Sequence, residues 1–142
     1  MELLQADATA LPFPDAHFDA VVSMFSHTDV DDFRALVAEG ARVLRPGGIF
    51  VYAGLHPCFI GPHSRFARAQ GVPSLYPGYR GPRRYTDAPG WAPDGLRAKV
   101  GAVHLPLGEL TQAFFDASLV LDWFEEHPEG EYPGRIALRA RR

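Results

Sequence analysis

The chain of 142 residues contains one cysteine, Cys58, and this scarcity limits the chemistry that the sequence can carry. A single thiol excludes an intramolecular disulfide and any zinc site built from several cysteines. The sequence also lacks internal repeats, low-complexity tracts and any apolar run long enough to span a bilayer. Acidic Glu2 and Asp7 stand where a secretion signal would be basic and then apolar, so we expect a cytoplasmic protein without a membrane partner.

Positive charge is not in excess either, since the formal net charge is −3. Arginines gather at residues 80–84 and 139–142, but basic residues on a terminal strand are typical of a solvated edge. We therefore expect no nucleic-acid partner. The apolar and charged fractions, 46% and 22%, are typical of one globular domain with a real core.

Residues 18–54 hold the clearest pattern, which is a strand, a capped helix, a tight turn and a second strand. Residues 18–24 form a short apolar run with β-branched residues at its centre, which favours a strand. Thr28 is expected to cap the helix, whose apolar stripe comprises Phe33, Leu36, Val37, Gly40, Val43 and Leu44. Residues 49–53 are apolar on both faces, so we expect them to lie inside a sheet, parallel to residues 18–24.

Three strings in this region resemble a known family. They are D-A-x-x-L-P-F at residues 7–13, F-D-A-V-V-S at residues 18–23 and R-V-L-R-P-G-G at residues 42–48. They are similar to strings of the class I S-adenosylmethionine-dependent methyltransferases, in particular the small-molecule branch that includes ubiquinone/menaquinone biosynthesis methyltransferases. The resemblance covers essentially the whole chain. It implies an α/β fold with an incomplete Rossmann-like sheet, mostly parallel with an antiparallel C-terminal hairpin.

The sequence contains no G-x-G-x-x-G motif. In the family a glycine-rich turn and a strand that ends in a ribose-binding acid come first, so the resemblance implies a truncated chain that lacks this N-terminal portion. We expect a single partial domain with cofactor-side elements at 1–54, an insertion at 55–104 and a C-terminal helix and hairpin at 105–142. The remaining cofactor contacts are then expected to bind weakly on their own.

The resemblance places S-adenosylmethionine at the carboxyl edge of the sheet, beside a small-molecule methyl acceptor. It implies that the Asp7 carboxylate accepts from the adenine amino group, that the Ala8 N–H donates to the ring, and that Met24 and Phe25 lie beside the methionine part. The residues alone leave another interpretation open, in which Asp7 only bonds to the backbone of a turn.

Two histidines follow the predicted strands and are candidate catalytic bases, His27 and His56. A base is needed only if the acceptor carries a proton, and His27 can equally be bonded near the helix entry. His56, Cys58 and His63 do not complete a zinc-binding pattern, so we expect no metal.

Residues 54–104 form an irregular stretch of about fifty residues, rich in proline and glycine but also in aromatic residues. We interpret it as a lid that determines substrate specificity, or as a packed surface excursion, with a short helical turn at 66–69. A helix from Pro106 to about Ala117 precedes a hairpin of residues 119–125 and 135–141. The last strand has the pattern of a half-exposed strand, not a central one.

The resemblance also leaves strand 18–24 at an open edge, whose unpaired backbone groups invite another strand. We expect residues 3–6 to pair directly beside Val21, with self-association through this edge as the next outcome and aggregation as the third.

The sequence leaves two candidate functions. The first is S-adenosylmethionine-dependent methyl transfer to an unidentified small molecule, and the alternative is a non-catalytic truncated remnant that acts as a binding or interaction domain.

Overall fold

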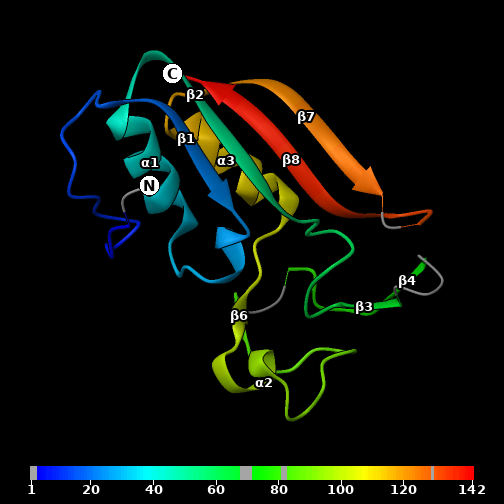
Figure 1. Ribbon diagram of the computed structural model, residues 1–142. Coiled ribbons are helices and arrows are strands. Elements are labelled where there is room, and N and C mark those ends of the chain that lie inside the picture. The colour runs from blue at the N-terminus through cyan, green and yellow to red at the C-terminus, as the bar shows by residue number, and fades with distance from the viewer. Residues whose placement is uncertain (1–2, 68–71, 81–82, 129) are drawn as a thin grey trace.

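The computed structural model describes residues 3–67, 72–80, 83–128 and 130–142, and its elements follow the order strand, helix, strand, insertion, helix, hairpin (Figure 1). The first part comprises β1 (Phe18–Met24), the 3-10 turn η1 (Ser26–Thr28), α1 (Phe33–Val43) and β2 (Leu44–Leu55). The insertion holds β3 (Ser64–Ala67), β4 (Val72–Leu75), β5 (Arg84–Tyr85), α2 (Leu96–Val100) and β6 (Ala102–Val103). The last part comprises α3 (Leu107–Asp116), β7 (Val120–Pro128) and β8 (Pro133–Arg141).

The main sheet has the strand order β1-β2-β8-β7 among the described residues. β1 and β2 are parallel, with Val21 opposite Phe50, which confirms the predicted pairing of the two apolar strands. β8 runs antiparallel to both β2 and β7, so β7 has the same direction as β1 and β2. The predicted C-terminal hairpin is therefore confirmed. The last strand is half-exposed as predicted, since its residues alternate between buried and more exposed. The prediction that it is not central is wrong, because β8 lies between β2 and β7.

Helix α1 begins later than the sequence pattern indicated. The Asp32 carboxylate accepts from the N–H of Ala35 at 3.0 Å and caps the helix. Thr28 is not the cap, because it belongs to η1 and its hydroxyl donates to the Phe25 carbonyl at 3.1 Å. The expected apolar stripe is nevertheless buried along its length, since the residues that follow the cap keep their spacing.

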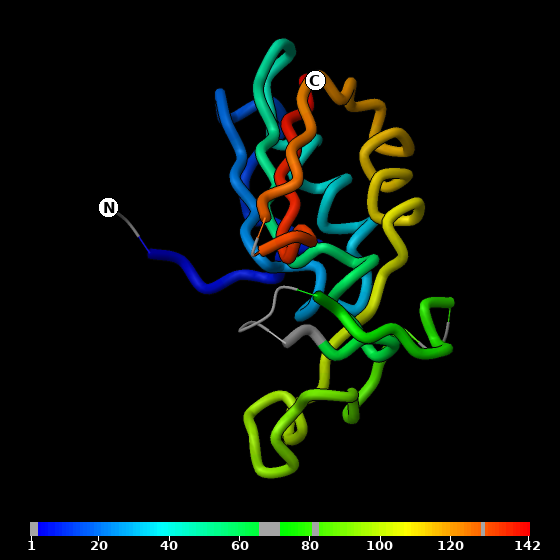
Figure 2. The backbone as a smooth tube through the Cα atoms, turned by 90° about the vertical axis from the view of Figure 1, so that its right-hand side faces the viewer, coloured from blue at the N-terminus to red at the C-terminus, as the bar shows by residue number. Residues whose placement is uncertain are grey.

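Helices α1 and α3 cover one face of the sheet, as Figure 2 shows from the side. The core lies between them and the inward side chains of β2 and β8, and its fully buried members include Val37, Phe50, Tyr52, Leu110, Phe114, Ile136 and Leu138. Phe50 and Phe114 meet edge to face at 5.4 Å between ring centroids. Gly40 of α1 makes this contact possible, because a Cβ at Gly40 would overlap the ring of Phe50.

The opposite face of the sheet and its β1 edge are open among the described residues. Val22 and Met24 of β1 are 64% and 63% exposed, and β1 pairs with β2 alone. Residues 3–6 form no strand and do not pair with Val21, so the prediction of direct pairing is wrong. The segment instead runs away from the sheet (Figure 2), where Leu3 and Leu4 are exposed.

The insertion lies at the carboxyl ends of β1 and β2 (Figure 1) and carries two small antiparallel pairs, β3 with β4 and β5 with β6. The predicted helical turn at 66–69 is wrong for Phe66 and Ala67, which belong to β3, and residues 68–69 lie outside the described residues. Helix α3 follows Pro106 as predicted and ends at Asp116, and Ser118 then turns the chain with a φ of 58°. Among the described residues, no helix is long and apolar enough to cross a membrane.

Candidate functional site

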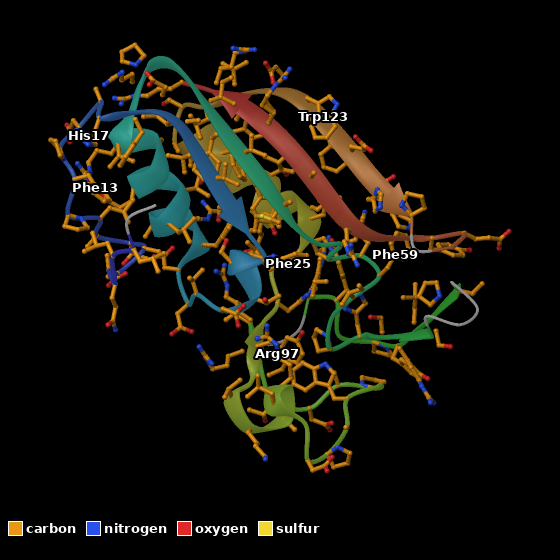
Figure 3. The ribbon with its side chains drawn as sticks, viewed as in Figure 1. Phe13, His17, Phe25, Phe59, Arg97 and Trp123 are labelled. Carbon is orange, nitrogen blue, oxygen red and sulfur yellow. The ribbon has the colours of Figure 1, made fainter. Side chains whose placement is uncertain are left out.

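The site begins at the tip of β1, where the chain leaves the sheet at Phe25. Phe25 has a φ of 55°, in the left-handed region that few residues other than glycine adopt. Its N–H donates to the Ala53 carbonyl of β2 at 2.8 Å, and Ser23 and Ser26 are joined by a hydroxyl hydrogen bond of 2.6 Å. These bonds hold Phe25 in this conformation, and Figure 3 shows the residue beside the tip of β1.

A cavity of about 400 Å³ opens between this turn and the insertion. We call it the acceptor cavity, and its lining comes from the residue after β1, from η1, β2 and β8, and from the insertion: Phe25, Thr28, Leu55, Ile60, Gly61, Ser64, Tyr85, Pro89, Gly90, Trp91, Arg97, Ala102 and Arg135. Its position is the carboxyl edge of parallel strands, where open α/β sheets bind ligands.

Two aromatic rings form one wall of the acceptor cavity. Tyr85 and Trp91 stack with their ring centroids 4.9 Å apart and their planes at 27°. Burial raises the pKa of Tyr85 to about 12, so its hydroxyl keeps its proton at neutral pH. The sequence indicated only that the aromatic residues of the insertion supply apolar area, because their mutual placement depends on the path of the chain between them.

Arg97 of α2 anchors the insertion to the turn after β1. Its guanidinium donates to both carboxylate oxygens of Asp29, one of them at 3.2 Å, and approaches the Thr28 hydroxyl at 3.5 Å. The hydrogen bond from Arg97 lowers the pKa of the Asp29 carboxyl, which therefore stays ionised. Figure 3 shows Arg97 below Phe25, and both residues line the acceptor cavity. Sequence reasoning did not find Arg97, because its contact with Asp29 joins residues that lie far apart in the chain.

A smaller cavity of about 290 Å³ lies on the open face of the sheet. Its lining includes Met24 of β1, Phe25 directly after it, Trp123 of β7 and Arg135 of β8. Phe25 and Arg135 line both cavities and thus stand between them. The structure therefore brings the predicted residues Met24 and Phe25 together at this point.

Asp7 and Ala8 lie elsewhere along the N-terminal segment and line neither cavity. The Oδ1 atom of Asp7 accepts from the Thr9 N–H at 2.8 Å and from the Thr9 hydroxyl at 2.7 Å. These bonds lower the pKa of the Asp7 carboxyl and are those of the turn that the alternative interpretation described. Ala8 packs against the core and fixes the segment in place.

The two candidate bases are buried and hydrogen-bonded to other groups. His27 is 3% exposed, and its Nδ1 lies 2.5 Å from the Tyr52 hydroxyl. Burial lowers the pKa of His27 to about 4, so it is neutral at pH 7. His56 is 1% exposed, with Nε2 at 2.7 Å from the Glu126 carboxylate and Nδ1 accepting from the Cys58 N–H at 3.2 Å. Neither histidine lines either cavity.

Two further buried histidines, His63 and His104, hold the ends of the insertion together. Their rings lie 5.0 Å apart, and each directs Nε2 at a carbonyl, that of Cys58 at 3.0 Å and that of Tyr79 at 2.9 Å. The Tyr79 hydroxyl in turn accepts from the N–H of Leu107 at 2.8 Å. No group of three or more metal-ligating side chains occurs in the part of the chain that the structure describes.

Comparison with known proteins identifies relatives of the first part of the chain. The family model described as "Methyltransferase domain" matches residues 1–52. A fatty-acid O-methyltransferase from Mycolicibacterium smegmatis is 47% identical over 57 residues, which are 40% of this chain and 21% of that protein. A ubiquinone/menaquinone biosynthesis C-methyltransferase from Shewanella halifaxensis is 51% identical over 45 residues, 32% of this chain and 18% of that protein. The match thus spans about a fifth of these curated relatives.

The fold extends the similarity to nearly the whole chain. The crystal structure of an S-adenosylmethionine-dependent methyltransferase from Mesorhizobium loti superposes with a TM-score of 0.75 at 22% identity, covering 96% of this chain and 67% of that one. The predicted α/β fold class is confirmed, and so is the resemblance that the sequence motifs indicated.

Proposed function

We propose that this chain, which has the fold of the class I S-adenosylmethionine-dependent methyltransferases, serves methyl transfer from S-adenosylmethionine to a small molecule. The observation that carries the proposal is the acceptor cavity, because it opens beside Phe25 at the carboxyl end of β1 and the insertion closes its other side. Its volume of about 400 Å³ lies within the usual range of small-molecule sites. The relatives named for fatty-acid and quinone methylation support an acceptor of this class.

The residues present fit one side of the cofactor. Both hydrogen bonds from Thr9 fall on Oδ1 of Asp7, so the exposed carboxylate keeps Oδ2 for the adenine amino group. Ala8 packs against the core, and in this proposal its backbone N–H would donate to the adenine ring. Met24 and Phe25 offer an apolar surface at the tip of β1 for the methionine part. The bound cofactor supplies a methyl group that is already activated on a sulfonium.

The chain's own residues then align the acceptor and exclude water. The stacked rings of Tyr85 and Trp91 form one wall, and the Arg97–Asp29 ion pair holds the insertion over the turn. His27 and His56 stay candidate bases, but each is bonded to another group, so in this proposal the ionisation of the acceptor itself supplies the nucleophile. A cytoplasmic location and the lack of a nucleic-acid partner remain parts of the proposal that depend on the sequence alone.

Titration of the chain with S-adenosylmethionine tests the proposal. We expect a dissociation constant of about 1 mM, equivalent to about −4 kcal/mol, because the described residues contact only one side of the cofactor. Asp7→Asn should weaken binding, and the matched control Asp94→Asn, at an exposed position, should not. A micromolar constant would contradict the one-sided site. A lack of binding at about 10 mM, or equal effects of both variants, would overturn the proposal.

One observation favours a second candidate, a non-catalytic domain that binds another chain. The described part of β1 has an unpaired edge, and self-association through residues 18–24 would cover it. Formation of S-adenosylhomocysteine with any acceptor decides between the two candidates, since a non-catalytic domain releases none.

A further inference from the structure

We infer that residues 86–101, which we call the flap, open and close over the acceptor cavity, and that the ion pair of Arg97 with Asp29 is the latch that holds the flap closed. The inference adds a controlled entry step to the proposed function, and it rests on that function for the identity of what enters. Opening of the flap can be measured without cofactor or acceptor, so the inference can hold even if methyl transfer does not.

The flap supplies one part of the cavity wall. Its lining residues are Pro89, Gly90, Trp91 and Arg97, and the rest of the lining comes from elements outside the flap, including Phe25. Figures 1 and 2 both show the flap, which contains α2, as a projection at one end of the molecule that joins the rest of the chain near β6. A movement of this projection away from the turn after β1 would therefore open the acceptor cavity to solvent.

The base of the flap is held in place. β5 and β6 pair antiparallel where the two ends of the flap meet, and both residues of β6 are buried. The Arg83 side chain donates to the Glu109 carboxylate of α3 at 2.6 Å. The neighbouring Arg84 donates to the Asp31 carboxylate at 2.5 Å. Gly101 ends the flap with a φ of 77°, and the wide conformational range of glycine lets this position absorb a rotation of the flap about its base.

The flap itself contributes little to the core. In residues 86–100, all of which the structure describes, only Ala88 is buried. Helix α2 has no buried residue, and its Leu96 and Val100 are 73% and 55% exposed. Trp91 packs on Tyr85 at the base of the flap, so this contact does not tie the flap to the turn after β1. A segment with so few buried apolar contacts separates from its surroundings at a low cost in free energy.

The latch is the polar contact that joins the flap to the turn. Arg97 donates to both carboxylate oxygens of Asp29, one of them at 3.2 Å, and approaches the Thr28 hydroxyl at 3.5 Å. In the described part of the chain, no other side chain of the flap forms a hydrogen bond or an ion pair with residues outside it. The Arg97 and Asp29 side chains are 38% and 53% exposed. Exposed ion pairs are weak and are screened by salt, which suits a contact that opens and closes.

Thiol labelling measures the opening of the flap. Thr28 is 6% exposed, lines the cavity and lies next to Arg97, so a thiol at this position is covered while the latch is closed. The reference chain carries Thr28→Cys together with Cys58→Ser, and the reagent is N-ethylmaleimide, whose lack of charge limits the effect of salt to the protein. We expect labelling to accelerate when NaCl is raised from about 0.05 M to about 0.5 M. Ser64→Cys, at another buried position of the cavity, serves as a second reporter and should respond alike.

Variants of the latch identify the contact that controls labelling. Arg97→Gln should speed labelling about threefold, because loss of an exposed ion pair shifts an equilibrium by roughly this factor. The variant should also lose the response to salt. Lys99→Gln, which removes an exposed charge from the same helix, should change neither property. Asp29→Asn should act like Arg97→Gln, and the double variant should label no faster than either single one, because both changes remove the same contact.

Three results would overturn the inference. Equal labelling rates in Arg97→Gln and Lys99→Gln would show that the ion pair does not hold the flap. A reference chain whose labelling ignores salt would exclude an electrostatic latch. Labelling that rises with urea as steeply as global unfolding would show that the thiol is reached only in the unfolded chain, since opening of the flap alone exposes little surface. The expected labelling pattern without any binding of S-adenosylmethionine would keep this inference and refute the proposed function.

Discussion

The hydroxyl of Tyr52 and the Nδ1 atom of His27 lie 2.5 Å apart within the core, where they join the central strand β2 to the turn that follows β1. Tyr52 is fully buried, and its burial raises the pKa of its hydroxyl, so the pair is neutral at pH 7. A neutral pair at this place couples the position of the turn beside the acceptor cavity to the packing of the core.

The His27–Tyr52 pair predicts a loss of stability in acid. The unfolded chain protonates His27 near pH 6.5 and the folded chain only near pH 4, so the unfolded state binds more protons between these values. The contribution of His27 to the free energy of unfolding is fully present above pH 6.5, and it falls by up to about 3 kcal/mol as the pH approaches 4. Urea unfolding measured at several pH values in this range should show that the free energy of unfolding depends less steeply on pH in His27→Asn than in the wild type. An equal pH dependence in His27→Asn and in the wild type would contradict this account. His17→Asn, at an exposed position, is the control and should keep the pH dependence of the wild type.

Tyr79→Phe should destabilise the chain by about 1–2 kcal/mol. The change removes the hydroxyl that accepts from the N–H of Leu107 at the start of α3, and that donor then lacks its partner. Tyr76→Phe is the matched control, because Tyr76 is exposed and should cost almost nothing. Equal midpoints of chemical unfolding for both variants would show that the hydrogen bond to Leu107 does not contribute to the stability of the chain.

Gly40→Ala should cost about 1–3 kcal/mol, because the new methyl group would overlap the ring of Phe50 in the packed core. Gly108→Ala in α3 tests the opposite case, since a Cβ there meets no atom within 4 Å. It should stabilise the chain by about 0.5–1 kcal/mol through helix propensity. Thermal unfolding of the two variants therefore should shift in opposite directions, and a shift of Gly40→Ala toward higher temperature would refute the close contact.

The edge of β1 predicts association that depends on concentration. Val22→Lys combined with Met24→Lys places two charges on this exposed strand and should shift the chain toward the monomer in sedimentation velocity. Val72→Lys and Leu75→Lys on β4 are the control, because they replace exposed apolar residues outside the main sheet. If only the β4 variants dissociate the chain, the edge of β1 is not the contact.

Replacing Asp32 by Ala should cost about 1 kcal/mol, because the first turn of α1 loses the acceptor for the N–H of Ala35. Thr28→Ala should leave the helix start intact, since the Thr28 hydroxyl donates to Phe25 and lies outside α1. Amide exchange at Ala35 distinguishes the two variants. Faster exchange in Thr28→Ala alone would restore Thr28 as the cap.

The sequence predicted those parts of the fold that local patterns determine. The continuous apolar runs of β1 and β2 predicted a parallel pair, and the spacing of apolar residues predicted the buried stripe of α1. The start of α1 was misplaced because both Thr28 and Asp32 have the side chain of a cap, and only the 3-10 turn that takes up Thr28 decides which one acts. Residues 3–6 have the composition of a strand, but their pairing depends on a neighbour that local composition does not specify.

The site was predicted only in part, because its geometry depends on contacts between distant residues. Met24 and Phe25 were placed by their position at a strand end, which is a local property. The Arg97–Asp29 ion pair and the Tyr85–Trp91 stack depend on how the insertion folds back over the turn, and no local pattern encodes this path. The two histidines have chemistry that suits a base, but their burial was not visible in the sequence.

Phe25 and Arg135 form a partition shared by the two cavities. A molecule bound in one cavity that displaces either side chain into the other cavity leaves less space there. Binding in the two cavities should therefore be thermodynamically linked. Because such linkage is reciprocal, a compound that fills the smaller chamber should change the affinity of the larger one by the same factor as it is changed in return. The smaller chamber is thus a natural position for an effector or an inhibitor that never touches Trp91.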